Sequence, residues 1–278
     1  MEKIFLRRFI LILAVLALSG CNLQTKMLYY PETNIPPQES LAADNIQFWP
    51  SGPDNYRGFV SSAPESGSKG TVVVFHGNAG TASDRVFYAK ALAPLGFRVI
   101  LAEYPAYGGR KGKPSEAAFV NDGKETLRLA FEKYGKPIFL LGESLGCGVA
   151  AAVARDAPVP IKGMILITPW DTLLSVAKEK FPWLPVRLFL TDRYDTVADL
   201  KMFQGRIAVA GAEQDDVIPI GHALALYESL PGTKKMWTVH GAGHNDWPDF
   251  AGPSWWKELT DFVAGNNRTE NSTVKAPI

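Results

Sequence analysis

Ser144 stands at the centre of the pentapeptide Gly-Glu-Ser-Leu-Gly, between an apolar run at 137–141 and an alanine-rich segment. A serine held in a tight turn between a buried strand and the start of a helix needs small neighbours two residues away on either side, because a larger side chain would collide there. Gly142 and Gly146 meet that need. The pattern predicts a nucleophilic serine, provided that the chain also supplies a base and an acid.

Candidates for the base and the acid follow other apolar runs. Acidic residues, among them Asp215, follow the run at 206–210, and two histidines follow the run at 234–239, the second of them His244. A neutral imidazole can take a proton from a serine near neutral pH, and an ionised carboxylate holds that imidazole in the right tautomer. Because the carboxyl ends of the strands gather at one edge of an α/β sheet, we expect these side chains to share a site.

These runs belong to a regular alternation of apolar strands and helical segments. The predicted strands are 46–49, 71–75, 98–102, 137–141, 161–168, 206–210 and 234–239, and the predicted helices are 83–93, 115–133, 145–156, 220–230 and 255–263. Continuous apolar runs are typical of strands in a parallel sheet that helices cover on both faces. The predicted fold class is therefore α/β, with a doubly wound, mostly parallel central sheet.

The alternation is interrupted between about 170 and 199, where aromatic residues and two prolines stand in place of a core unit. Connections of this length often form a lid or a binding segment, so we expect a small cap insertion, with a structural helix pair as the alternative. The main domain is expected to span 45–264. The polar tail at 265–278 has the composition of a disordered segment.

The chain resembles the α/β-hydrolase superfamily from about residue 27 to about residue 263. The resemblance rests on the His-Gly-Asn loop at 76–78, the Gly-x-Ser-x-Gly pentapeptide and the Gly-His-Asn-Asp ending at 243–246. The chain order serine, acid, histidine is also that of the superfamily. In pattern the chain resembles in particular the small-capped serine hydrolases that include protein-depalmitoylating enzymes. The resemblance implies an α/β-hydrolase fold with catalysis through an acyl-enzyme and no cofactor.

The resemblance also implies roles for individual residues. Ser144, His244 and Asp215 form the implied catalytic triad, since Asp215 occupies the acid position of Asp-x-Val-Ile-Pro and His244 the base position of Gly-His-Asn-Asp. The implied oxyanion hole consists of the backbone amides of Leu145, directly after the nucleophile, and Asn78, on the loop after the first central strand.

Two of these roles have alternatives in the sequence. The acid could instead be Asp216 or Asp171, and the base could be His240 at the end of the last predicted strand. His76 is expected to orient the oxyanion loop, and Glu143, inside the pentapeptide, to face solvent. No Cys or His residues cluster at ligand spacing near the acidic residues, so the sequence predicts no metal site.

The amino-terminal residues read as an export signal, since three basic residues precede an apolar stretch at 9–18 that is too short for a transmembrane helix. Leu-Ser-Gly-Cys at 18–21 resembles the lipobox of bacterial lipoproteins, which implies removal of 1–20 and lipidation of Cys21. Residues 21–44 would then be the lipid anchor and tether, with an ordinary signal peptide as the alternative. The resemblance implies a location in the cell envelope, on the outer membrane facing the periplasm in a Gram-negative organism.

Composition limits the possible classes of function. The 278 residues carry a net charge of +1 and are 46% hydrophobic, which suits one large domain with a sizeable core. With one of its two cysteines expected to carry lipid, the chain cannot build a disulfide framework, and Cys147 is expected to be a small buried side chain. The sequence has no basic cluster with interleaved aromatic residues, which argues against a nucleic-acid partner. It does not indicate an oligomeric state.

Together these patterns predict a membrane-anchored serine hydrolase that cleaves carboxylic esters or thioesters of acylated or lipid-like substrates. A serine peptidase or an acyltransferase would use the same triad. A non-catalytic envelope lipoprotein that binds a lipid or a partner is the alternative from a different class.

Overall fold

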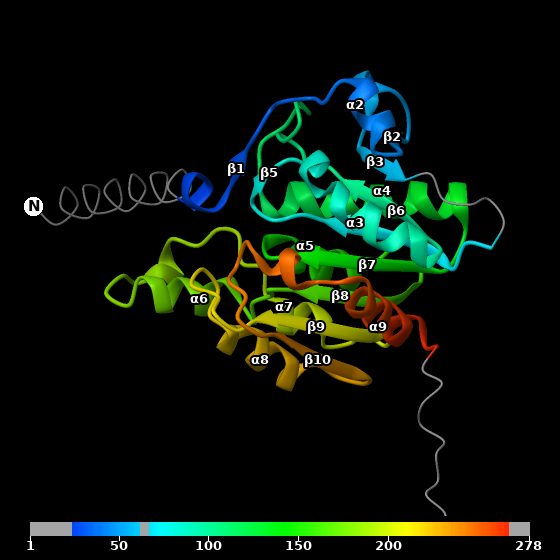
Figure 1. Ribbon diagram of the computed structural model, residues 1–278. Helices are drawn as coiled ribbons and strands as arrows, with labels where there is room; N and C mark the ends of the chain where they lie inside the picture. Colours follow the sequence, from blue (N-terminus) through cyan, green and yellow to red (C-terminus); the bar gives the residue numbers. More distant parts are fainter. Residues whose placement is uncertain (1–23, 62–66, 267–278) are drawn as a thin grey trace, which may run out of the picture.

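The computed structural model describes residues 24–61 and 67–266, and a twisted sheet forms its centre (Figure 1). The strands of this sheet are, in chain order, β2 (Ile46–Trp49), β3 (Gly58–Ser61), β4 (Gly70–Phe75), β6 (Phe97–Ala102), β7 (Ile138–Glu143), β8 (Ile161–Ile167), β9 (Arg206–Ala212) and β10 (Lys234–Val239). Their spatial order is β10-β9-β8-β7-β4-β6-β3-β2. Neighbouring strands from β10 to β6 pair in parallel. Strand β3 pairs antiparallel with both of its neighbours, β6 and β2. The predicted α/β fold with a mostly parallel sheet is confirmed.

Helices cover both faces of the sheet (Figure 1). One face carries α4 (Glu116–Tyr134), α5 (Leu145–Arg155), α7 (Thr196–Leu200) and α8 (Ile220–Ser229), and the other carries α3 (Val86–Leu92) and α9 (Pro253–Ala264). Side chains of the central strands alternate between two cores, so that Val73 and Leu140 join the first and Val72 and Leu141 the second. Both faces of these strands are buried, which explains their uninterrupted apolar sequence.

One expected helix and one strand of the central sheet differ from the sequence prediction. The helix expected at 83–93 is divided into a 3-10 turn, Ala82–Arg85, and α3, after which Pro94 lies in a second 3-10 turn. The first turn begins with a capping box between Thr81 and Asp84. Strand β3 was not predicted, because four residues that begin with glycine give too short a pattern to recognise.

The segment from about 170 to 199 contains two helices joined by an irregular stretch. α6 (Leu173–Lys180) precedes that stretch, which includes the 3-10 turn Val186–Leu188, and α7 follows it. An antiparallel bridge between Thr172 and Asp195 brings the two ends of the segment together. The segment therefore leaves the sheet after β8 and returns to it before β9.

The first described residues pack against the main domain. Residues 24–28 are helical, β1 (Tyr30–Pro31) pairs in parallel with β5 (Ala79–Gly80), and α2 (Gln38–Ala43) follows. The predicted signal at 1–20, the predicted lipidation site Cys21 and residues 267–278 of the predicted tail lie outside the described residues. Within the described ranges, no helix is long and apolar enough to cross a membrane.

Candidate active site

Ser144 lies in a strained turn between β7 and α5. Its φ is +53°, a conformation that non-glycine residues rarely adopt. A Cβ added at Gly142 would lie 2.6 Å from the Cα of Cys147, and one added at Gly146 would lie 2.0 Å from the carbonyl oxygen of Phe75. Both positions therefore have room for glycine only, as the pentapeptide predicts.

Ser144, His244 and Asp215 form a continuous hydrogen-bonded chain. His244 Nε2 is 3.0 Å from Ser144 Oγ, and His244 Nδ1 is 2.7 Å from Asp215 Oδ2. An ionised carboxylate only accepts hydrogen bonds, so Nδ1 carries the proton of the neutral ring. That tautomer leaves the lone pair of Nε2 facing the serine hydroxyl, where it can take the hydroxyl proton.

Backbone amides hold Asp215 in place after β9. Its Oδ1 atom accepts hydrogen bonds from the amides of Val217 at 2.9 Å and Ile218 at 2.7 Å, and its side chain is 1% exposed. The carboxylate thus faces His244 with one oxygen while the loop occupies the other. Asp216 is exposed instead, and its carbonyl oxygen accepts from Lys180 Nζ at 2.6 Å.

The other histidines have carboxylate partners of their own. These pairs are His76 with Glu103, His222 with Asp171 and Glu179, and His240 with Glu213. Of the four histidines, all of which are described, only His244 is hydrogen-bonded to the side chain of Ser144. The structure therefore does not bring the alternatives Asp171, Asp216 and His240 to the nucleophile.

The loop after β4 lies beside Ser144. A Cβ added at Gly77 would be 3.7 Å from the Cβ of Ser144. His76 Nδ1 lies 2.8 Å from the carbonyl oxygen of Gly77, which can only accept, so this nitrogen donates. Because a trans peptide is planar, the amide of Asn78 points away from that carbonyl and from the His76 ring. Leu145 is the first residue of α5, and its amide has no acceptor within the helix.

Glu103 supports this loop, although the sequence analysis did not select it. Its side chain is fully buried, and its oxygens accept from the amide of Ala82 at 2.9 Å and lie 3.1 Å from His76 Nε2. Tyr104 also supports the loop, since its hydroxyl donates to the carbonyl oxygen of His76. Glu103 directly follows β6, so the search for polar residues after each strand would have found it.

Glu143 does not face solvent, contrary to the expectation from the sequence. Its side chain is 14% exposed and accepts from Arg85 Nε at 3.0 Å and from the hydroxyl of Tyr88 at 2.7 Å. Burial, together with the nearby Glu143, raises the pKa of Tyr88 well above its ordinary value. Arg85 Nη2 also donates to the carbonyl oxygen of Ala79 at 3.4 Å, so Arg85 links the serine turn to the loop after β4. No local sequence signal identifies Arg85, because its partners lie in distant segments.

Cys147 is fully buried on α5, as expected of a small core side chain. Its Sγ donates to the carbonyl oxygens of Gly142 and Ile167, both at 3.2 Å. Burial raises the pKa of the thiol well above its ordinary value, which keeps the sulfur protonated and unreactive.

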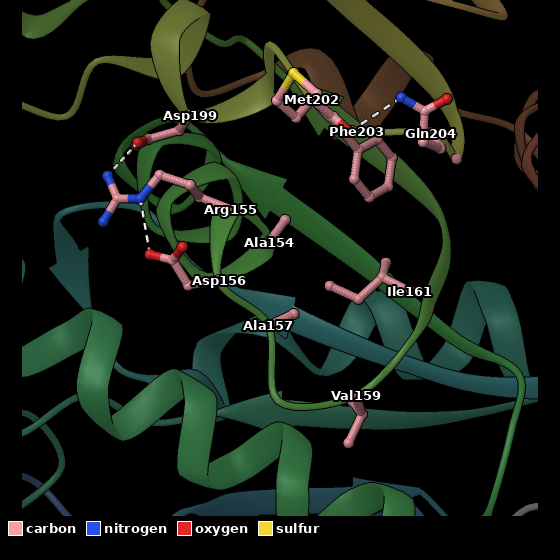
Figure 2. A pocket seen from close by; sticks show the side chains of 11 residues that line it. Ala154, Arg155, Asp156, Ala157, Val159, Ile161, Asp199, Met202, Phe203 and Gln204 are labelled. Carbon is pink, nitrogen blue, oxygen red and sulfur yellow. Dashed lines mark hydrogen bonds and ion pairs between the residues drawn. The ribbon is translucent and has the colours of Figure 1, made fainter.

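A pocket of about 300 Å³ lies away from this site (Figure 2). It is lined by residues at the end of α5 and between α7 and β9, where Arg155 pairs with Asp156 and Asp199. None of the residues of the Ser144 site lines it. In the described part of the chain, no group of three or more His, Cys, Asp or Glu residues could hold a metal ion.

Comparisons with known proteins agree with the fold. A family model described as "alpha/beta hydrolase fold" matches residues 70–197. An uncharacterised protein of Mycobacterium tuberculosis is 31% identical over 229 residues, which cover 80% of this chain and 81% of that protein. Lysophosphatidylserine lipase ABHD12 of Danio rerio is 27% identical over 65% of this chain and 50% of its own length.

Solved structures with the same fold include two hydrolases. An esterase of Pyrococcus furiosus superposes with a TM-score of 0.64 at 17% identity, covering 85% of this chain and 96% of the esterase. A monoacylglycerol lipase of Paleococcus ferrophilus gives a TM-score of 0.55 at 18% identity, covering 75% and 98% of the two chains. The fold, the family match and the similar relatives together show that this chain belongs to the α/β-hydrolase superfamily.

Proposed function

We propose that the protein is a lipid-anchored serine hydrolase that cleaves carboxylic esters or thioesters through an acyl-enzyme. One observation carries the proposal: the hydroxyl of Ser144, in its strained turn, lies 3.0 Å from His244 Nε2, and the same imidazole lies 2.7 Å from the buried Asp215. This arrangement supplies a nucleophile, a base and an orienting acid within direct hydrogen-bonding distance.

In the proposed first step, Ser144 Oγ attacks the carbonyl carbon of the substrate while His244 Nε2 takes the hydroxyl proton. The negative charge that develops on the carbonyl oxygen is stabilised by the amides of Leu145 and Asn78. The positive end of α5 adds to this stabilisation, since Leu145 is its first residue.

The tetrahedral intermediate then collapses, and the bond to the leaving alcohol or thiol breaks as His244 returns the proton to it. Water attacks the resulting acyl-enzyme with His244 as the base once more, which releases the carboxylic acid and restores Ser144. Asp215 stays ionised throughout and stabilises the imidazolium that forms in each half of the reaction.

Acylated or lipid-like substrates are proposed on two grounds. The relatives include a protein named as a lysophosphatidylserine lipase, and structures of the same fold include an esterase and a monoacylglycerol lipase. The resemblance to protein-depalmitoylating hydrolases adds acyl thioesters such as protein-bound palmitate to the proposed substrates. No cofactor takes part in the proposed reaction.

The proposed anchor is a lipid on Cys21, which would hold the enzyme in the cell envelope. In a Gram-negative organism the proposed place is the outer membrane, facing the periplasm. The test is Cys21→Ser, which should move the protein out of the membrane fraction. A substituted chain that fractionates like wild type would contradict the anchor.

Labelling with a fluorophosphonate probe tests the nucleophile. Wild-type protein should be labelled and Ser144→Ala should not. Ser175→Ala is the matched control, because the Ser175 hydroxyl also lies near a histidine, 3.4 Å from His222 Nδ1, yet has no proposed role in catalysis. A wild-type protein that stays unlabelled would refute the enzyme proposal.

The acyl preference is tested with p-nitrophenyl esters of increasing chain length. We expect kcat/KM to rise from acetate to longer acyl chains. A clear preference for acetate would contradict lipid-like substrates while leaving the serine hydrolase itself in place.

A further inference from the structure

The irregular stretch between α6 and Tyr194 presents two large apolar side chains to solvent. Trp183 is 76% exposed and Leu188 is 78% exposed, while Val186 between them is buried and fixes the turn to the body of the protein. Isolated exposed apolar residues are ordinary in soluble proteins. Trp183 and Leu188, however, lie five residues apart on one short stretch, which therefore offers two large apolar side chains to a partner.

Basic residues flank these two apolar residues in the sequence. Residues 173–193 contain four basic and two acidic residues: Lys178, Lys180, Arg187 and Arg193 against Glu179 and Asp192. Both acidic side chains are engaged, Glu179 with His222 and Asp192 with the hydroxyl of Tyr29. Lys178, Arg187 and Arg193 are exposed, and none of them forms an ion pair with another described residue. The segment therefore has unpaired positive charge, although the whole chain has a net charge of only +1.

The amino-terminal segment is fixed beside the same stretch. The side chain of Gln24 accepts from the amide of Thr191 at 2.6 Å and donates to the carbonyl oxygen of Asp192 at 2.9 Å. Cys21 precedes Gln24 by three residues, which span at most about 11 Å even when fully extended. Lipid on Cys21 would therefore enter a bilayer close to this stretch.

These features lie on the side of the molecule that carries the candidate active site. Figure 1 shows the short dark blue helix at 24–28 and α6 on the side toward which the arrowheads of β7 and β8 point. Ser144 directly follows β7 and so belongs to that edge of the sheet. We use the name cap face for Trp183 and Leu188 with the basic residues Lys178, Arg187 and Arg193.

We propose that the cap face docks on a bilayer that contains anionic phospholipid. Trp183 and Leu188 enter the headgroup region, where tryptophan is favoured, and the three basic residues lie at the level of the phosphates. The candidate active site then opens toward the membrane, and acyl substrates reach Ser144 from the bilayer. The inference rests on the proposed function for the anchor at Cys21 and for the acyl substrates, whereas the exposed residues and their charges are features of the described structure.

The test measures how deeply single labelled side chains enter the bilayer. It uses the full chain, purified from cells after they have processed its amino terminus. Leu188→Cys carries an environment-sensitive fluorophore, and Met202→Cys is the matched control, since Met202 is also 78% exposed. Met202 lies between α7 and the amino end of β9, beside the pocket of Figure 2 and away from the carboxyl edge. Cys147 is fully buried and should not react, and the unsubstituted chain gives the background from Cys21.

On vesicles of phosphatidylglycerol and phosphatidylethanolamine, we expect the label at 188 to shift to shorter wavelength and to be quenched several-fold by brominated lipid tails. The label at 202 should remain in water. Raising the salt from about 0.1 M to about 1 M should weaken the quenching, because the Debye length falls from about 10 Å to about 3 Å.

Three results would overturn the proposal. Equal quenching at 188 and 202 would mean adsorption without a preferred face, and equal quenching on phosphatidylcholine vesicles would mean that anionic lipid is not recognised. If the label at 188 stays in water on every kind of vesicle, the cap face does not enter a bilayer, and a protein partner becomes the better hypothesis for it. Fluorophosphonate labelling of the same variants reports on Ser144 separately, so the docking proposal and the hydrolase proposal can fail independently.

Discussion

At the scale of single residues, the candidate site depends on buried carboxylates that each lie against one histidine. Asp215 faces His244 with one oxygen and two backbone amides with the other, so its charge is held toward the imidazole. Glu103 lies 3.1 Å from His76 Nε2, and the other nitrogen of His76 donates to the carbonyl oxygen of Gly77, which fixes the peptide that precedes Asn78. The nucleophile and the proposed oxyanion donor are thus each oriented through a histidine and a buried acid.

Asp215→Asn should lower kcat by about 10⁴, because an asparagine favours the wrong tautomer of His244 and cannot stabilise the imidazolium. KM and the thermal midpoint should change little. Asp216→Asn is the control: Asp216 is the adjacent residue but is exposed, and only its backbone carbonyl is engaged. Steady-state kinetics of both variants on a p-nitrophenyl ester would measure the two losses in kcat. Equal losses in both variants would remove Asp215 from its proposed role.

The residues nearest the proposed reaction could be selected from the sequence because each lies within five residues of the end of a predicted strand. Ser144, Asp215 and His244 all follow that rule, and the structure brings the three together. Arg85 could not be selected, since it contacts Glu143 and Ala79 only after the chain has folded. Contacts between distant loops leave no periodic or spacing signal in the chain.

At the scale of elements, the turn from β7 to α5 depends on close contact with the neighbouring strand β4. In Gly146→Ala the new Cβ would lie 2.0 Å from the carbonyl oxygen of Phe75, and backbone atoms cannot rotate aside as a side chain can. We expect a loss of more than about 4 kcal/mol in the free energy of unfolding, or failure to fold.

Gly221→Ala, on α8, is the matched control. Nothing lies within 4 Å of a Cβ added there, so alanine should be neutral or should stabilise the helix by up to about 1 kcal/mol. Urea unfolding, or the soluble yield where a variant does not fold, measures both changes. Similar stabilities for the two variants would show that the turn can relax away from β4.

Elements with strong patterns were predictable, and the others required tertiary contacts. The strands at 46–49 and 234–239 have their predicted bounds, because apolar or alternating runs between turn residues define them well. The helix expected at 83–93 is shorter because Thr81 and Asp84 cap a separate turn before it, and β3 forms only because β2 and β6 flank it.

The contact between Asp171, just before α6, and His222 on α8 should make a pH-dependent contribution to stability. Burial opposes ionisation of Asp171, but hydrogen bonds from Ser175, the Thr172 amide and His222 outweigh it and hold the pKa of Asp171 below its ordinary value. A folded-state pKa below the unfolded value means that the ionised carboxylate stabilises the fold above about pH 3.9. This contribution is lost as the pH falls through the folded-state pKa.

Asp171→Asn should therefore cost about 1 kcal/mol at pH 7, and the difference from wild type should narrow as the pH falls below about 3.9. Urea midpoints of Asp171→Asn and wild type, measured across this pH range, test whether the difference in stability narrows at low pH. Asp249→Asn, at an exposed carboxylate, should match wild type throughout. A cost that stays constant with pH would show that ionisation of Asp171 does not contribute.

At the scale of the whole molecule, the first described residues join parts that are far apart in the chain. The amide of Tyr30 donates to the carbonyl oxygen of Asn78 at 2.9 Å, and Gln24 is hydrogen-bonded to Thr191 and Asp192. The segment after the proposed anchor thus contacts both the loop that carries the proposed oxyanion donor and the stretch that carries the cap face. The proposed docking at the membrane and the geometry of the candidate site would therefore share one structural support.

A substitution at Tyr29 should measure how much these contacts of the amino-terminal segment contribute to stability. The Tyr29 hydroxyl lies 2.6 Å from Asp192 Oδ2 and 3.1 Å from the hydroxyl of Tyr194, and burial followed by the hydrogen bond to Asp192 raises its pKa well above the usual range. The hydroxyl therefore stays protonated and donates. Tyr29→Phe keeps the packed ring but leaves the carboxylate of Asp192 without this donor, which should cost about 2 kcal/mol and lower Tm by about 5 °C.

Tyr30→Phe provides the comparison, because the Tyr30 hydroxyl donates to the carbonyl oxygen of Met27 on a side chain that is 52% exposed, and its removal should change stability by less than about 0.5 kcal/mol. Hydrogen exchange should locate the effect: amides from 186 to 194 should exchange faster in Tyr29→Phe, while amides of α9 keep their protection relative to global unfolding. If the two variants melt alike and exchange alike, the amino-terminal segment only lies on the surface, and the link between the anchor and the candidate site has no energetic basis.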